Sequence, residues 1–184
     1  MKPLDNLLPA LALTAATLVT ALPAHAFDLN SDEPINVKAD HARLDDNKGI
    51  ATYTGDVIVT QADTRLDADK VVLYRNAEGL TRMEAEGKPA HYRQPAENDQ
   101  GETDAKALTI TWSAKDELLI LERQAVITQN GNVFKGDVVH YDTANRVVTG
   151  QGNPNSTSGD GGRVEMVIQP RSTKQESNGS PQGQ

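Results

Sequence analysis

The sequence predicts an all-β fold built from stacked antiparallel hairpins. From Ile35 onward, apolar residues recur at every second position in short runs, and helical spacing never persists for more than a turn. Turn-forming residues separate these runs. A short Asp-containing pattern also recurs along the chain, which is typical of repeats that stack and share one continuous core.

The apolar runs give the candidate strands in chain order. Most of them carry Val, Ile, Leu, Ala or Thr at alternate positions, as expected for strands with one buried face. They cover residues 35–39, 50–54, 57–61, 70–74, 80–86, 90–94, 107–112, 118–122, 125–129, 133–135, 138–141, 146–149 and 163–169.

Polar turns separate the candidate strands, and they lie at residues 45–49, 76–79, 87–89, 129–132 and 142–145. Asn130-Gly131 is the strongest turn signal, because a type I′ hairpin needs positive φ at both central residues. A long polar loop at 153–162 precedes the last strand. These turns imply antiparallel pairing of neighbouring strands.

Four segments share the repeated pattern of a small residue, Asp, three variable positions, and then Leu or Tyr. Their aspartates are Asp40, Asp69, Asp104 and Asp137, spaced 29, 35 and 33 residues apart. Stacked repeats are expected to place them at equivalent corners, where a carboxylate accepts backbone N–H bonds. This structural role is favoured over glycoside hydrolysis, which needs two carboxylates roughly 5–10 Å apart across a cleft.

The first 26 residues have the features of a secretory signal peptide. Lys2 lies in a short n-region, residues 7–22 are almost wholly apolar or small, and Ala24-His25-Ala26 forms an A-x-A cleavage signal. A membrane anchor is disfavoured because this stretch has 16 residues and contains Pro9, whereas a span needs about 20. We expect cleavage after Ala26, export to the periplasm, one β domain at 27–170 and a disordered tail at 171–184.

Composition excludes several functions. With no cysteine in the chain, disulfides, thiolate metal sites and cysteine nucleophiles are impossible. A net charge of -8 without any Lys/Arg block argues against nucleic-acid binding. His41, His91 and His140 fall in separate strand-like stretches, so we expect exposed strand residues rather than a metal site. No cofactor is implied.

Several short runs, taken in their order and spacing, resemble the LptA family of periplasmic lipopolysaccharide-transport proteins of the OstA type. The runs are GDVIVTQ at 55–61, ADKVV at 68–72, GKPA at 87–90, AKD at 114–116 and GD at 136–137. The resemblance covers roughly residues 34–170. It implies an OstA-like β-jelly roll, open at both ends, whose apolar interior holds the acyl chains of lipid A and conducts lipopolysaccharide from the inner to the outer membrane.

The same resemblance implies partners. It predicts a head-to-tail homo-oligomer, an LptC-like inner-membrane protein at the N-terminal edge and an LptD-like outer-membrane protein at the C-terminal edge. A bridge component of this kind is not an enzyme.

Candidate lipid-binding residues follow from strand parity and from the resemblance. Side chains two positions apart share a face of a strand, which groups Ile35 with Val37, Val57 with Val59, Val71 with Leu73, and Leu108 with Ile110 and Trp112. The resemblance implies that Ile35, Val37, Tyr92 and Trp112 match lining positions of the family. Phe134 falls in a comparable strand and is included with them.

Two other interpretations remain open at this point. A periplasmic scaffold or adhesin-like β-solenoid would have the same repeats around a sealed, filled core. A carbohydrate-active β-enzyme would need an acid pair and aromatic sugar platforms, and the chain offers one Trp and four Tyr.

Overall fold

The computed structural model describes residues 27, 33–96, 101–156 and 162–170. Within these ranges all regular structure is β, which confirms the predicted fold class. The strands are β1 (Asn36–Lys38), β2 (His41–Asp45), β3 (Ile50–Gln61), β4 (Thr64–Asn76), β5 (Gly79–Gln94), β6 (Thr103–Ser113), β7 (Leu118–Gln129), β8 (Asn132–Asp142), β9 (Val147–Gln151) and β10 (Glu165–Val167). The predicted signal peptide and C-terminal tail lie outside the described residues. Across the described ranges, no helix with the length and apolarity of a membrane span is present.

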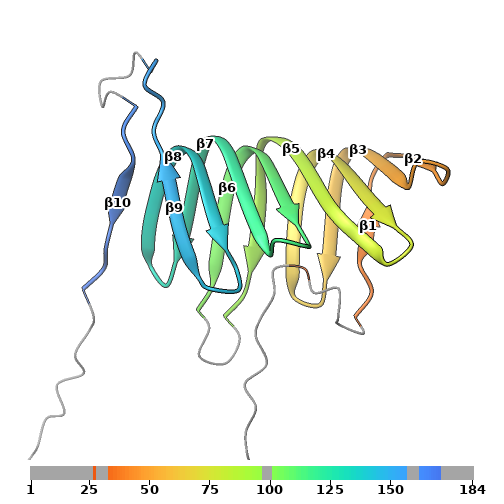
Figure 1. The fold of residues 1–184 in the computed structure, drawn as a ribbon, viewed down its shortest axis with the longest axis horizontal. Helices are drawn as coiled ribbons and strands as arrows, with labels where there is room; N and C mark the ends of the chain where they lie inside the picture. The colour runs from red at the N-terminus through yellow and green to blue at the C-terminus, as the bar shows by residue number, and fades with distance from the viewer. Residues whose placement is uncertain (1–26, 28–32, 97–100, 157–161, 171–184) are drawn as a thin grey trace, which may run out of the picture.

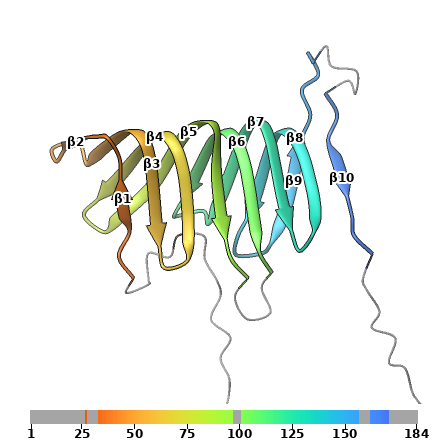
Figure 2. The same ribbon diagram turned by 180° about the vertical axis from the view of Figure 1, so that it is seen from behind.

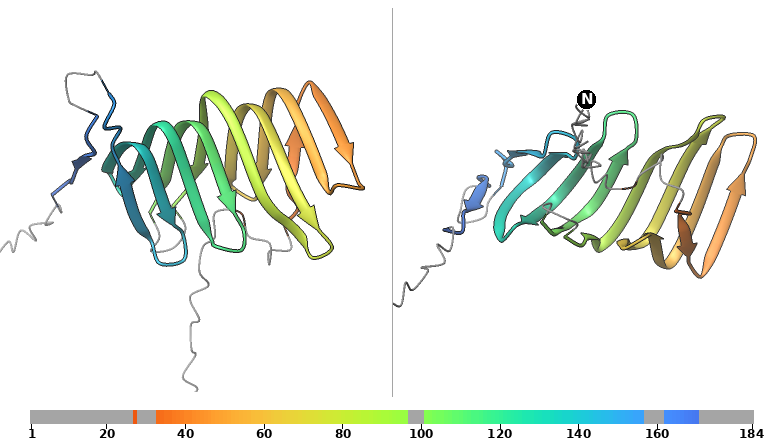
Figure 3. Two further views of the ribbon diagram at one scale, coloured as in Figure 1. Left: turned by 45° about the horizontal axis from the view of Figure 1, so that its top comes forward. Right: turned by 90° about the horizontal axis from the view of Figure 1, so that it is seen from below.

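The strands form one continuous antiparallel sheet that folds over on itself. Its order is β1-β3-β4-β5-β6-β7-β8-β10, with β2 beside β3 and β9 beside β8. Each long strand changes register near its middle, and the strands there bend from one layer into the other (Figure 3). The result is an unclosed β-jelly roll of stacked hairpins, open at both ends.

The bends divide the sheet into two facing layers. Layer A contains β1, residues 57–61, 64–68, 90–94, 103–107, 125–129 and 132–136 of the long strands, and β10. Layer B contains β2, residues 50–54, 70–76, 79–86, 109–113, 118–122 and 138–142, and β9. Figure 1 faces layer B, and Figure 2 faces layer A.

The ends of the stack are made differently from its middle. The two halves of β3 pair with different short strands, β1 in layer A and β2 in layer B. At the other end, β8 likewise pairs with β10 in layer A and β9 in layer B. Each end therefore presents two short edge strands, one from each layer.

The bends correct the predicted strand boundaries. Gly55-Asp56 and Gly87-Lys88-Pro89 were expected to separate strands, but each is a register shift within one strand, β3 or β5. Gly55 has φ of 83°, and a Cβ at that position would lie 2.3 Å from Oδ2 of Asp40. A position with positive φ favours glycine both at a bend within a strand and at a turn between strands, so the local sequence does not distinguish the two.

Other turns match the prediction. Asn130 and Gly131 have φ of 51° and 79°, as a type I′ hairpin between β7 and β8 requires.

The repeat aspartates match their predicted positions only in part. Asp40, Asp69 and Asp137 lie at bends, whereas Asp104 lies within β6, paired with Arg93 and Thr128. The expectation of equivalent corners is therefore wrong for Asp104, because the bend in β6 comes three residues later.

Candidate functional site

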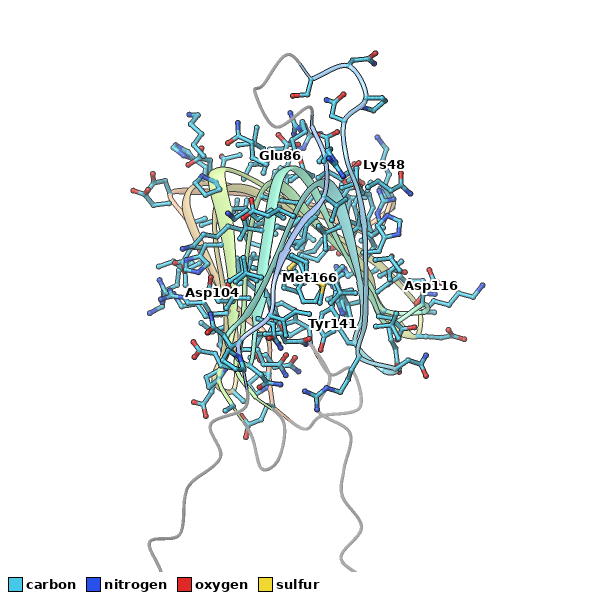
Figure 4. All side chains as sticks on the ribbon, turned by 90° about the vertical axis from the view of Figure 1, so that its left-hand side faces the viewer. Lys48, Glu86, Asp104, Asp116, Tyr141 and Met166 are labelled. Atoms are coloured by element: carbon cyan, nitrogen blue, oxygen red, sulfur yellow. The ribbon has the colours of Figure 1, made fainter. Side chains whose placement is uncertain are left out.

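The interior between the two layers is the main apolar region of the described chain. Both layers contribute fully buried side chains, including Val59, Tyr92 and Ile127 from layer A and Val71 and Leu121 from layer B. Seen along the stack, Tyr141 and Met166 lie near its centre, while the labelled charged residues lie at the periphery (Figure 4). The alternation of strand residues therefore separates an apolar inside from a charged outside.

A row of small residues crosses layer A beside the bends. It consists of Val57, Ala68, Ala90, Ala107, Ala125 and Gly136, three pairs of which face each other across neighbouring strands: Val57 with Ala68, Ala90 with Ala107, and Ala125 with Gly136. We call it the small-residue row. Because the layers converge at the bends, only short side chains fit there.

Larger side chains fill the interior away from the bends. Tyr92 in layer A and Trp112 in layer B are 1% and 4% exposed. The hydroxyl of Tyr92 donates to Oε1 of Gln94 at 3.0 Å, which satisfies its polar end. Burial, with a smaller contribution from Tyr141, raises the pKa of Tyr92 well above its ordinary value, so this phenol stays neutral.

The ring of Phe27 lies between these two aromatic side chains. Phe27 is 2% exposed, and its ring centroid is 6.1 Å from those of Tyr92 and Trp112, edge-to-face in both cases. The three rings connect layer A to layer B.

The structure brings most of the predicted site residues to this interior. Six of them are buried there: Val57, Val59, Val71, Tyr92, Ile110 and Trp112. Four are partly buried and pack against the same cluster: Ile35, Val37, Leu73 and Phe134. Their contact with lipid remains a prediction.

Leu108 departs from the predicted parity. It falls in the register shift of β6 between Lys106 and Thr109, and it lies outside the interior cluster of the described residues. Its neighbour Ala107 is fully buried instead. An extra residue at a bulge reverses the alternation, so Leu108 cannot share a face with Ile110 in the way the unbroken pattern predicted.

Sequence reasoning also missed several interior residues. The largest of them in the strands are Leu66, Met83, Leu119, Leu121, Ile127 and Val139. Parity within the predicted runs 118–122 and 125–129 was enough to find Leu119, Leu121 and Ile127. Phe27 has no such signal, because it lies outside every described strand.

The outer face of layer A carries paired charges. Asp67 accepts hydrogen bonds from Arg65 and, at 2.8 Å, from Arg93. The hydrogen bond from Arg65 is the main cause that lowers the pKa of Asp67. Partial burial acts against it, and Arg93 adds to it. Nε2 of His91 lies 2.6 Å from Oδ2 of Asp104. Within the described ranges, no group of three or more His, Asp or Glu side chains is arranged to hold a metal ion.

A family model described as "LptA/(LptD N-terminal domain) LPS transport protein" matches residues 36–147. The chain belongs to this family. The matched segment runs from β1 to the start of β9 and includes all of the bends and most of both layers, but not β10.

Named members of the LptA/LptD N-terminal domain family are similar over most of the chain. Lipopolysaccharide export system protein LptH of Pseudomonas aeruginosa is 37% identical, over 92% of this chain and 98% of the relative. Lipopolysaccharide export system protein LptA of Escherichia coli K12 is 31% identical, over 71% of each chain. The crystal structure of LptH, described as "the LptA homologous periplasmic component of the conserved lipopolysaccharide transport device", matches with a TM-score of 0.66 and 38% identity, over 75% of this chain and 96% of LptH.

In this LptA-family chain, the exposed large apolar residues gather at the two ends of the stack. Leu44 of β2 lies at the N-terminal end, and Val147 of β9 lies at the C-terminal end. Around β10, Val164, Met166, Val167 and Ile168 are 41–65% exposed. Leu44 pairs with the buried Ala51, and Met166 pairs with Phe134, which packs against the interior cluster, so the apolar interior reaches the edge strands β2 and β10. Val147 instead pairs with Asp142 on the outer face.

Proposed function

We propose that this protein is a periplasmic carrier that binds lipopolysaccharide by holding lipid A acyl chains between its two layers. The observation that carries the proposal is an apolar interior, open at both ends, in a member of the LptA/LptD N-terminal domain family. Transfer of a methylene out of water is worth about 0.8 kcal/mol. An acyl chain that crosses an aqueous compartment therefore needs apolar contact with a protein throughout the crossing.

The proposal assigns no reaction to this chain. Its named relatives are export-system proteins, which supports a role in moving lipopolysaccharide. We propose that residues 1–26 direct export to the periplasm and are removed by cleavage after Ala26, and the periplasmic description of LptH supports that location.

The unlike ends of the stack support a bridge of several domains. β1 and β2 at one end differ from β9 and β10 at the other, so two copies pair head to tail rather than symmetrically. We place an LptC-like partner at the β1 end and an LptD-like partner at the β10 end. The matching family includes the N-terminal domain of LptD by description, and a similar domain would supply a compatible edge.

A pair of charge substitutions tests the lipid site. Ile35 packs partly buried against the interior cluster, and its neighbour Asn36 is exposed. Because a buried aliphatic side chain is worth about 1.5–3 kcal/mol, Ile35→Asp should weaken lipopolysaccharide binding by about tenfold or more. Asn36→Asp adds the same charge on the other face and should bind like the parent.

Binding is measured on folded proteins, with circular dichroism as the check of folding. A photoreactive residue at position 35, but not at 36, should also crosslink to lipopolysaccharide. Equal binding by the two folded variants would show that the interior is not the lipid site.

A further inference from the structure

Phe27 fills part of the interior without belonging to the sheet. It precedes β1 by nine residues, and the chain at this position is not in a strand. Even so, its ring is as buried as the core residues contributed by the strands. A residue outside the sheet thus completes the packing between the layers.

The position of Phe27 coincides with the proposed acyl-chain site. Its two ring contacts are Tyr92 of layer A and Trp112 of layer B, and both are predicted lipid-binding residues. An acyl chain that reaches these two side chains must take the place of the Phe27 ring, because close-packed interiors do not hold both.

We propose that Phe27 is an internal ligand of the interior, which occupies the acyl-chain site in the lipid-free protein and leaves when lipopolysaccharide binds. This inference rests on the proposed function and adds that Phe27 competes with the acyl chains for the same space. Phe27 lowers the apparent affinity for lipid and shields the apolar interior from water when no lipid is bound.

The chemistry of the two competitors favours exchange. A single Phe ring offers far less apolar surface than a chain of about 14 carbons, so the lipid gains more from burial in the same space. If the leader is removed after Ala26, Phe27 is also the first residue and carries a positively charged α-amino group. The preference of that charge for water opposes deep burial and favours release of the ring.

Trp112 provides a direct readout of this exchange. It is the only tryptophan in the chain, and Phe27 lies against its ring. Addition of lipopolysaccharide to residues 27–184 should change the Trp112 emission. In Phe27→Ala, the lipid-free emission should already differ from that of the parent, because the ring contact is absent.

Binding affinities test the competition. The apparent dissociation constant rises as the open fraction falls, so an interior that is open about one tenth of the time should bind on the order of tenfold more tightly in Phe27→Ala. The matched control is Phe134→Ala, which removes the other phenylalanine of the chain, one that packs against the interior from β8. It should weaken binding.

A second measurement does not depend on affinity. A photoreactive residue at position 27 should crosslink within its own chain, and lipopolysaccharide should suppress that crosslink. Equal or weaker lipid binding by folded Phe27→Ala, or an internal crosslink that persists in saturating lipid, would overturn the competition. If the parent and both variants fail to bind lipopolysaccharide, the proposed function is refuted and the inference with it.

Discussion

Enlarging one side chain in the small-residue row should force the two layers apart. Ala107 is fully buried, faces Ala90 across the neighbouring strand and lies beside the bend of β6. Ala107→Leu adds three carbon atoms where Ala90 and Ala125 are themselves 0% and 1% exposed. Overpacking costs about 1–3 kcal/mol, and we expect the upper end because the neighbours have no room to give. At roughly 3 °C per kcal/mol for a domain of this size, the melting temperature should fall by about 10 °C.

The assay is urea unfolding followed by circular dichroism, with Lys106→Leu as the control. Lys106 is the preceding residue of β6 and is exposed on the outer face, so the same leucine there should change the free energy of unfolding by no more than about 0.5 kcal/mol. If Ala107→Leu is as stable as this control, the layers do not converge tightly at the bends.

Three further predictions concern the bends, the outer face and the edge. Gly55→Ala should lower the free energy of unfolding by about 2 kcal/mol, because its positive φ strains any other residue and the new Cβ meets Asp40. In an Asp40→Gly background the same substitution should cost less, and an equal cost in both backgrounds would contradict the contact. The Arg65 hydrogen bond holds the pKa of Asp67 below 3.8, so its contribution to stability is present above about pH 4 and is lost as the pH falls through the lower folded value. Asp67→Asn should be less stable than the parent by up to about 1 kcal/mol at pH 7 and equal to it in strong acid, whereas a pH-independent difference would exclude the ion pair. Intact protein should form concentration-dependent oligomers in light scattering that deletion of residues 164–169 abolishes with the β spectrum unchanged; an intact protein that stays monomeric at high concentration would contradict edge pairing.

Where parity was applied within one straight stretch of a strand, it placed both members of a pair in the interior. Val57 and Val59, or Ile110 and Trp112, lie on one side of a bend, and both members of each pair are buried. Parity failed at Leu108 because a bulge adds a residue and reverses the alternation. The local sequence shows that a bulge is possible but does not show which residue becomes the extra one, since the pairing of the neighbouring strand decides that.

The distinction between a bend and a turn was also beyond the local sequence. Gly87-Lys88-Pro89 ends a strand if the residues after it pair with a new neighbour, and bends the strand if they pair with the same one. In β5, the residues before and after this segment both pair with β4 and β6, so the segment is a bend. Phe27 was unpredictable for a related reason. Its burial depends on Tyr92 and Trp112, which are distant in sequence and meet only in the folded sheet.

The division of every long strand between two layers sets the length of the molecule along the stack. Among the described residues, each layer holds eight strand segments, and neighbouring strands lie about 4.8 Å apart. A head-to-tail assembly would therefore advance by about 38 Å for each copy added. Since the two layers end in separate strands, a joint between copies in such an assembly would have two strand pairings, β10 with β1 and β9 with β2. A joint with only one of these pairings formed would be free to rotate about it, and formation of the second would fix the orientation of the two copies.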